Sequence, residues 1–328
     1  PTLAGKAYFV LIVRNQMSLS FPSDILQMTA VTVPMLLAEN KGLDPLDALR
    51  TIAITDGIPE LVRLFDFQRP FAENLGVLFT QNSAYFRCAE SELHRNFRTP
   101  ETYSILLYGM ATGHNRVSQI AEFSGFPQNK CDKYLNALDK AELLETVQRK
   151  DTAGHVRTHY YPKGGYWKTW FRYVFPSQGR CLKPLEGDSL QLLANDIDHS
   201  IVAEYFKTVC WKWMKKNYGD YYWDEVLRFD DPKQQDVTVN GVHFDYVQET
   251  KDHTIYVKIW DDIGEGFPKA EFQKIETVTT KNRPFYENIY FLFSAGRACN
   301  YVEQLRNLDT VAVVDLKSLL GQKNKELF

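Results

Sequence analysis

The spacing of apolar residues changes twice along this 328-residue chain, and each change predicts a different kind of fold. Such a length exceeds one ordinary domain of about 100–150 residues. Up to residue 98 the apolar residues recur mostly at helical spacing, after one strand-like run at Ala7–Val13. Residues 99–161 indicate helices followed by a hairpin, and residues 162–328 indicate strands that alternate with helices. We therefore predict a mixed α+β and α/β multidomain protein, divided at 1–98, 99–161 and 162–328.

The composition excludes several other classes of protein. With 44% hydrophobic, 24% charged and 14% aromatic residues, the chain can bury a core and is neither disordered nor coiled-coil. The longest apolar run is far shorter than the roughly 20 residues of a membrane helix, so we expect no membrane partner. Five scattered cysteines without a CxxC pair favour reduced thiols and a cytoplasmic location. The net charge of −3 predicts no overall attraction to nucleic acid, although it leaves room for a local basic face.

A phosphate-binding loop is absent from the sequence. Gly5-Lys6 superficially matches the end of such a loop, but the glycine required five residues earlier would precede Pro1. Ala7 also stands where a serine or threonine would hold magnesium. No other glycine-rich cradle occurs, so we expect this chain alone neither to bind nor to hydrolyse ATP.

Residues 99–161 have the order of a winged helix. A helix that begins at Thr99 is expected to end at Gly109, and helices at Val117–Ser124 and Asn129–Ala141 flank a tight turn. Two strands, Leu143–Arg149 and Arg157–Tyr161, follow as a hairpin. In a nucleic-acid reader the third helix would enter a groove. The side chains that it would offer are Asn129, Lys130, Lys133, Asn136 and Lys140.

The charge of this segment leaves two partners open. Residues 101–161 carry seven lysines and arginines and seven aspartates and glutamates. A DNA reader usually has a basic excess, because phosphate contacts supply much of its affinity. Winged helices also serve as docking modules for proteins. DNA and a protein partner are therefore equal alternatives at this point.

The stretch from His243 to Lys258 bears most directly on chemistry. Metal-dependent nucleases place one acid at the end of a strand and an Asp/Glu-x-Lys on the next, where the acids hold Mg²⁺ and the lysine positions water. Asp245 and Lys258 fit this pattern across a hairpin that turns at Glu249–His253. Tyr256 stands in the place of the second acid and is a poor magnesium ligand. We expect Asp245 and Lys258 to pair, with Tyr256 in the same pocket and no cleavage.

Two alternatives to a non-catalytic domain remain. The first is a metal-dependent nuclease that uses Asp236, Asp245, Lys258 and either Glu204 or Glu249, with Mg²⁺ held by Asp245. The second is a purely protein-interaction module, which the neutral charge and a group of aromatic residues favour. That group is Tyr221, Tyr222 and Trp223.

Several short motifs occur in an order that resembles one known family. They are Leu3–Lys6, Thr55–Asp66, Tyr103–Gly113, Lys133–Leu138, Phe244-Asp245, Ile255–Trp260, Tyr290–Ser294 and Val313–Leu316. Together they resemble the carboxyl-terminal portion of the archaeal-type AAA+ ATPases, which combine a lid, a winged helix and a restriction-endonuclease-like domain. The resemblance covers almost the whole chain from about Leu3.

The resemblance implies a helical lid segment over 1–98, a winged helix over 99–161 and a degenerate nuclease-like domain over 162–328. The family's phosphate loop would lie upstream of Pro1, so ATP is implied only if such a loop exists there. The chain departs from the family at Lys6, at Tyr256 and at Lys207, where arginine, glutamate and glutamate are expected. Glu204 lies one turn from the last of these as a substitute acid. The resemblance thus implies a non-catalytic region that binds nucleic acid or docks a partner, without a cofactor or small-molecule substrate of its own.

Overall fold

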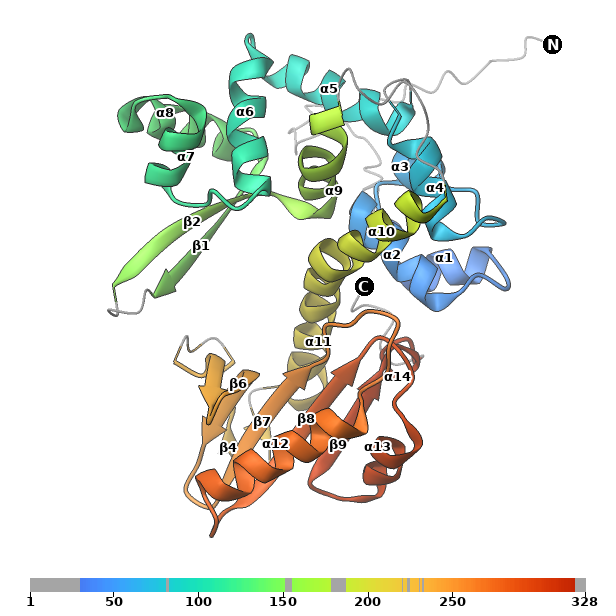
Figure 1. Ribbon diagram of the computed structural model, residues 1–328, viewed down its shortest axis with the longest axis vertical. Coiled ribbons are helices and arrows are strands. Elements are labelled where there is room, and N and C mark those ends of the chain that lie inside the picture. The colour runs from blue at the N-terminus through green and yellow to red at the C-terminus, as the bar shows by residue number, and fades with distance from the viewer. Residues whose placement is uncertain are drawn as a thin grey trace, which may run out of the picture.

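The computed structural model describes residues 30–80, 83–150, 155–177, 187–219, 221–222, 225–229, 231 and 233–321. The expected strand at Ala7–Val13, the motif at Leu3–Lys6 and Trp223 lie outside these residues. The described part contains many helices and open sheets, so the predicted mixture of α and β structure is confirmed. Figure 1 shows a helical body and a sheet body joined by the long helix α11 (Ala203–Tyr218).

The helical body is built from two stretches of the chain. Its first helices are α1 (Val33–Glu39), α2 (Pro45–Thr55), α3 (Pro59–Val62), α4 (Phe71–Leu78) and α5 (Ala84–Asn96). Its later elements are α9 (Gly164–Thr169), the π-helix η1 (Trp170–Val174), the 3-10 helix η2 (Phe175–Ser177), α10 (Asp188–Ile197) and the π-helix η3 (Asp198–Val202). α2 packs against α9 and η3, and α10 packs against α4. The helices that follow residue 162 therefore contribute to the same core as those that precede residue 98.

Polar contacts hold these two stretches together. The Asp56 side chain accepts hydrogen bonds from the backbone N–H groups of Gly165 (2.7 Å) and Tyr166 (3.1 Å), at the start of α9. Arg50 on α2 donates from Nε to Asp198 Oδ1 at 2.9 Å, and the Asp198 side chain is almost fully buried. A charged pair in such a position fixes the relative placement of α2 and η3, because either partner alone would be a costly buried charge.

A compact unit of helices and a hairpin follows α5. It consists of α6 (Pro100–Ala111), α7 (Val117–Ser124), α8 (Gln128–Lys140) and the antiparallel strands β1 (Leu144–Lys150) and β2 (Val156–Pro162). The expectation that Gly109 ends the first helix is wrong, since α6 continues to Ala111. Glycine is required at this position because a Cβ atom there would lie 2.7 Å from the Phe123 ring of α7.

The sheet body holds a five-stranded sheet in the order β5-β6-β7-β8-β9. The strands are β5 (Gln235–Val239), β6 (Val242–Glu249), β7 (His253–Ile259), β8 (Glu287–Ser294) and β9 (Val311–Asp315). β6 runs antiparallel to both of its neighbours, β5 and β7, whereas β7, β8 and β9 are parallel. The remaining elements are β3 (Tyr221–Tyr222), β4 (Glu225–Val226), α12 (Lys269–Asn282), α13 (Asn300–Gln304), η4 (Leu305–Asn307) and α14 (Leu316–Leu319).

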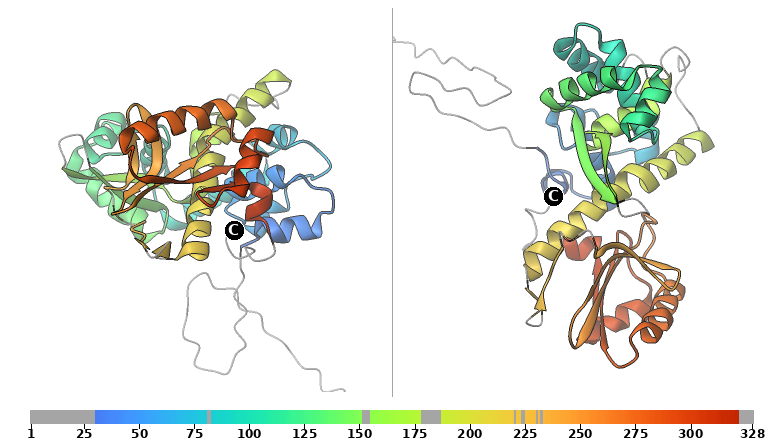
Figure 2. Two further views of the ribbon diagram at one scale, coloured as in Figure 1. Left: turned by 90° about the horizontal axis from the view of Figure 1, so that it is seen from below. Right: turned by 90° about the vertical axis from the view of Figure 1, so that its left-hand side faces the viewer.

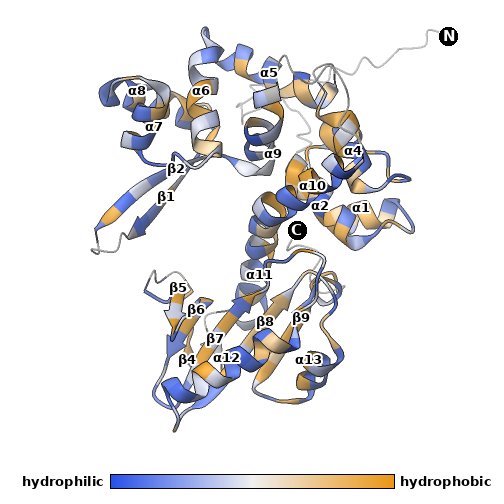
Figure 3. Ribbon diagram, in the orientation of Figure 1, coloured by the Kyte–Doolittle hydropathy of each residue, from blue (hydrophilic) through white to orange (hydrophobic). Residues whose placement is uncertain are grey.

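Helices cover both faces of this sheet, as the views in Figure 2 show. On the α11 face, Trp211 packs edge-on against Tyr246 and Trp213 against Phe293. On the α12 face, Phe272 packs edge-on against Tyr290. The central strands are accordingly apolar along most of their length in Figure 3, as expected for strands buried on both sides. In the described residues no helix combines the length and the apolar character required to cross a membrane.

Candidate functional sites

The exposed face of α8 carries the five side chains that the sequence singles out. Asn129, Lys133, Asn136 and Lys140 follow one another at intervals of four, three and four residues, which places them in one line along the helix. All four are exposed, and so is Lys130 beside them. The opposite face of α8 is held in the core by three buried residues. They are Cys131, Leu135 and Leu138.

The edges of this line differ in charge. On one edge the Lys130 ammonium lies 4.7 Å from the centre of the Phe126 ring and 5.6 Å from that of Tyr134, close enough for cation–π attraction. Asp132 and Asp139, both exposed, lie on the other edge. Burial raises the pKa of Tyr160 on β2, and the carboxylate of Asp132 raises it further. The line is thus bordered by a lysine on one edge and by two aspartates on the other.

The hairpin adds a group of basic side chains that the sequence analysis did not single out. Arg149 on β1 lies directly opposite Arg157 on β2, and its guanidinium carbon lies 5.7 Å from the centre of the Tyr161 ring. His159 shares this face, because residues two apart on a strand point the same way. Burial lowers the pKa of His159, and the charges of Arg149 and Arg116 lower it further. The hairpin thus gathers positive charge at the end of the unit.

In the sheet body, Asp245 on β6 forms the centre of the candidate nuclease site. Its side chain is only 8% exposed. One carboxylate oxygen accepts a hydrogen bond from the backbone N–H of Ile259 at 2.7 Å. The other oxygen lies 2.8 Å from the Nζ of Lys207 on α11. Both oxygens of this buried carboxylate therefore have a donor from the protein itself.

Lys207 also reaches a second acid. Its Nζ lies 3.2 Å from Asp236 Oδ1 on β5, and that same oxygen lies 3.9 Å from His243 Nε2. Asp236 adopts a left-handed backbone conformation (φ 51°), which aspartate tolerates better than most residues. Burial alone would lower the pKa of Lys207, but the carboxylates of Asp245 and Asp236 outweigh it and raise that pKa. Lys207 is accordingly a stable ammonium ion between two carboxylates.

The expected pairing of Asp245 with Lys258 is wrong. Among the described residues no ion pair joins these side chains, and Lys258 Nζ donates instead to the backbone carbonyl of His243 at 2.8 Å. Tyr256 is not in the Asp245 pocket either. Its ring is buried with Phe244 and Tyr290 in the cluster on the α12 face. The physical reason is the alternation of side chains along β7, which turns both Tyr256 and Lys258 away from α11.

The remaining candidate acids lie apart from this centre. Glu204 is engaged by Lys168, whose Nζ lies 2.6 Å from Glu204 Oε1 and 3.4 Å from Glu145 on β1. Glu249 is exposed at the end of β6. The contact made by Glu204 links α11 to α9 and the hairpin, which is a structural task rather than the ligation of a metal.

The donor atoms around Asp245 do not fit the Mg²⁺ ion that a nuclease would require. Asp236, His243 and Asp245 place ligand atoms within 4.8 Å of one another, but two of these residues are exposed and the Lys207 ammonium lies among them. Magnesium requires several oxygen ligands in near-octahedral geometry, and an ammonium at hydrogen-bonding distance from both carboxylates opposes a second cation. We therefore derive no metal-dependent step at this site.

The resemblance pointed to Lys207 as a position where that family has an acid. A second signal was the position of Asp245 in an otherwise apolar strand. Neither signal indicates that Lys207 and Asp245 pair, because only the packing of α11 across the sheet brings the two side chains together. The basic group on the hairpin had no comparable signal, because the pairing of β1 with β2 brings Arg149 and Arg157 opposite each other.

Comparisons with known proteins give little further information. The chain matches no protein-family model and no solved structure. It is similar to an uncharacterized protein of Methanocaldococcus jannaschii, with 28% identity over 127 residues. The match covers 37% of this chain and 28% of the archaeal protein. The chain thus matches little more than a quarter of that relative's length.

Proposed function

We propose that this chain is a non-catalytic region that binds duplex DNA through a winged helix formed by α6, α7, α8 and the β1–β2 hairpin. The observation that carries the proposal is the line of exposed polar and basic side chains along α8. Side chains in one line on an exposed helix suit the major groove, which is wide enough to admit an α-helix. Asparagine and lysine are also among the side chains that contact bases and phosphates.

The hairpin supports the same proposal. Winged-helix wings lie beside the third helix, and here that position carries Arg149, Arg157 and His159. Arg149 and Arg157 lie directly opposite each other in the hairpin, and two positive charges in this arrangement would favour an approaching anion. The phosphate groups of a DNA duplex would supply such anions along the hairpin.

The sheet body fits a restriction-endonuclease-like domain that has lost its chemistry. A mixed sheet with an acid on β6 and a helix across one face is the arrangement that the resemblance implies. Lys207 stands where an acid would complete the metal site, and it neutralises Asp245 instead. We therefore propose a supporting role for this body, and we propose that the whole chain is related to the carboxyl-terminal portion of AAA+ ATPases.

DNA binding can be tested with a labelled mixed-sequence duplex at low salt, with fluorescence anisotropy as the readout. Replacing Lys133→Glu together with Lys140→Glu reverses two charges on the α8 line. We expect affinity to fall by about tenfold or more, since each phosphate contact contributes through counterion release. The matched control is Lys251→Glu with Lys281→Glu, two exposed lysines of the sheet body, which should leave affinity within about twofold.

Docking of a protein partner is the second candidate, and a specific observation favours it. Asp132 and Asp139 flank the basic line, so the face of α8 has a mixed charge pattern that suits a protein surface. Absence of DNA binding by the wild-type chain at low salt would remove the first proposal and leave this one. If the α8 variant and the control lose DNA affinity equally, binding follows the net charge of the protein alone, and the proposal of DNA binding through α8 is removed.

A further inference from the structure

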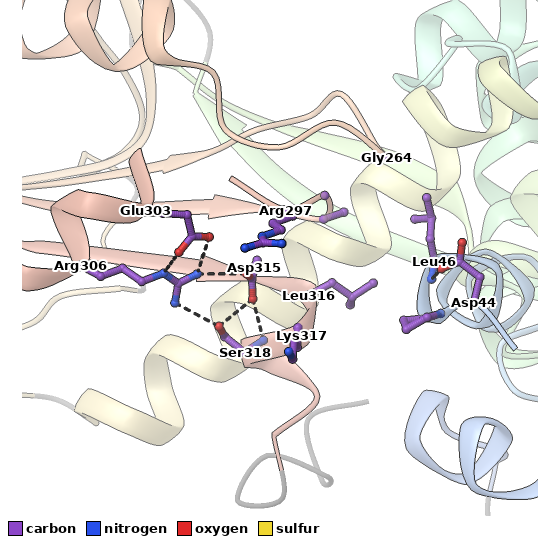
Figure 4. A pocket seen from close by; sticks show the side chains of 13 residues that line it. Asp44, Leu46, Gly264, Arg297, Glu303, Arg306, Asp315, Leu316, Lys317 and Ser318 are labelled. Carbon is purple, nitrogen blue, oxygen red and sulfur yellow. Dashed lines mark hydrogen bonds and ion pairs between the residues drawn. The ribbon is translucent and has the colours of Figure 1, made fainter. Parts of the chain in front are cut away.

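A cavity of about 880 Å³ lies where the helical body meets the sheet body, far from α8 and on the opposite side of the sheet body from β5 (Figure 4). This volume is within the range of about 300–1,000 Å³ that is usual for small-molecule sites. One wall is the start of α2 at Asp44–Leu46. The other wall is the carboxyl edge of the parallel strands β8 and β9, at Ala295–Arg297 and Asp315–Ser318. Open α/β sheets bind ligands at this edge.

The basic side chains that line the cavity differ in whether an acid pairs with them. Arg306 is already neutralised, because its Nε lies 2.6 Å from Glu303 Oε2 and its Nη2 lies 3.0 Å from Asp315 Oδ2. Asp315 is further occupied by the backbone N–H and hydroxyl of Ser318, each at 2.7 Å. Figure 4 shows this network as one connected group on the sheet wall. These residues form a fixed framework and offer little free charge to a ligand.

Arg297 and Lys317 differ from Arg306. Both are exposed and line the cavity, and neither makes a hydrogen bond or ion pair through its side chain within the part of the chain that the structure describes. Their backbones are held in place. Arg297 follows Gly296, where a Cβ atom would lie 2.4 Å from the Glu265 carbonyl carbon, and Lys317 lies within α14. Arg297 and Lys317 therefore follow the ends of two adjacent strands, and among the described residues no carboxylate pairs with either side chain.

We propose that this cavity binds a small phosphate monoester through Arg297 and Lys317. A guanidinium presents paired donors that match phosphate oxygens, and a lysine adds a compact charge. Asp44 on the facing wall disfavours a second anionic group there but accepts hydrogen bonds from hydroxyl groups, while Leu46 and Leu316 provide apolar surface. The ligand is therefore a singly phosphorylated, hydroxylated compound. The proposal is independent of DNA binding by α8.

The test uses the full chain with inorganic phosphate and glycerol 3-phosphate as probes, at constant ionic strength, and measures the melting temperature. A ligand that binds only the folded state raises this temperature saturably. We expect saturation with the wild type. In Arg297→Ala with Lys317→Ala, the half-saturating concentration should rise at least about tenfold. The control Lys251→Ala with Lys281→Ala should respond as the wild type.

Glycerol alone at the same concentrations should have no saturable effect. The double variant should bind duplex DNA as the wild type does, which separates this site from α8. The proposal is overturned if neither phosphate compound stabilises the wild type saturably. It is equally overturned if the Arg297/Lys317 variant, folded as judged by circular dichroism, responds to both compounds as the control does.

Discussion

Two lysines on α8, Lys133 and Lys140, and Lys207 on α11 carry the same charge in opposite settings. Lys133 and Lys140 extend into solvent from a helix whose other face is buried. Lys207 lies between two carboxylates, with Nζ–O distances of 2.8 and 3.2 Å. A solvated ammonium remains available to an external anion, whereas an ammonium that already neutralises a buried acid does not. The cluster around Asp245 has the residue types of a catalytic site, yet its charges are already neutralised within the protein.

The same contrast holds for the acids around them. Asp132 and Asp139 beside the α8 line are exposed and tune the surface potential. Asp245 is buried, and its two oxygens are satisfied by Lys207 and by the Ile259 N–H group. We therefore expect substitutions at α8 to change binding and substitutions at Lys207 to change stability.

The largest expected effect is on stability, from Lys207→Met. Removing the ammonium leaves the buried Asp245 carboxylate without its cation, which should cost about 1–3 kcal/mol of unfolding free energy. Urea unfolding followed by tryptophan fluorescence measures this loss. In the variant that also carries Asp245→Asn, most of the loss should be recovered. If Lys207→Met alone is as stable as the wild type, the Lys207–Asp245 ion pair does not contribute to stability.

A second prediction concerns metal binding. Replacing Lys207→Glu places a third carboxylate beside Asp236 and Asp245 and should create affinity for Mn²⁺ where the wild type has none. At ten times the dissociation constant the gain would be about 1.4 kcal/mol of stability, visible as a rise in melting temperature. If Mn²⁺ or Mg²⁺ stabilises the wild type saturably and Asp245→Asn abolishes this effect, Lys207 does not keep cations out of the Asp245 site.

A third and smaller effect, a dependence of DNA affinity on pH, is expected from His159. Burial and the charges of Arg149 and Arg116 lower its pKa in the free protein, so the unfolded chain takes up the proton first and stability falls as pH drops through about 6.5. Nearby phosphates would raise that pKa. Affinity should therefore increase by about two- to fivefold as pH falls from about 8 to 6. At constant ionic strength, His159→Gln should flatten this profile, and an unchanged slope would exclude His159.

The smallest effect is expected from Glu204→Gln. Lys168 keeps its contact with Glu145, so the change should cost less than about 1 kcal/mol, as is usual for a partly exposed ion pair. Burial lowers the pKa of Lys168, but the two glutamates outweigh it and raise that pKa. DNA affinity should not change measurably. A large loss of DNA affinity in this variant would place Glu204 in the binding site rather than in the link between α9 and α11.

Local patterns allowed much of the fold to be predicted from the sequence. The helix at Val117–Ser124 and the strands near 236–259 and 289–315 occur where their apolar spacing indicates. Gly109 was misjudged because its reason is tertiary: it makes room for the Phe123 ring. The packing of α9 and α10 on α2 and α4 also could not be foreseen, since it joins segments more than a hundred residues apart.

The candidate site was predictable in its residues but not in its pairing. Asp245 and Lys258 are on neighbouring strands, yet the face that each side chain occupies depends on the detailed course of β6 and β7. Lys207 comes from a helix almost forty residues earlier, and only its packing across the sheet brings it to Asp245. Strand alternation and helix docking decide such contacts, and neither has a signature within a short motif.

Binding of duplex DNA without cleavage is tested most directly by measuring both in the same sample. Purified wild-type chain is mixed with a labelled duplex in the presence of Mg²⁺ or Mn²⁺, and anisotropy is recorded before the DNA is examined on a denaturing gel. We expect binding that weakens with rising salt and in the Lys133→Glu, Lys140→Glu variant, with the duplex intact at every time point. Metal-dependent cleavage that Asp245→Ala abolishes would contradict this expectation.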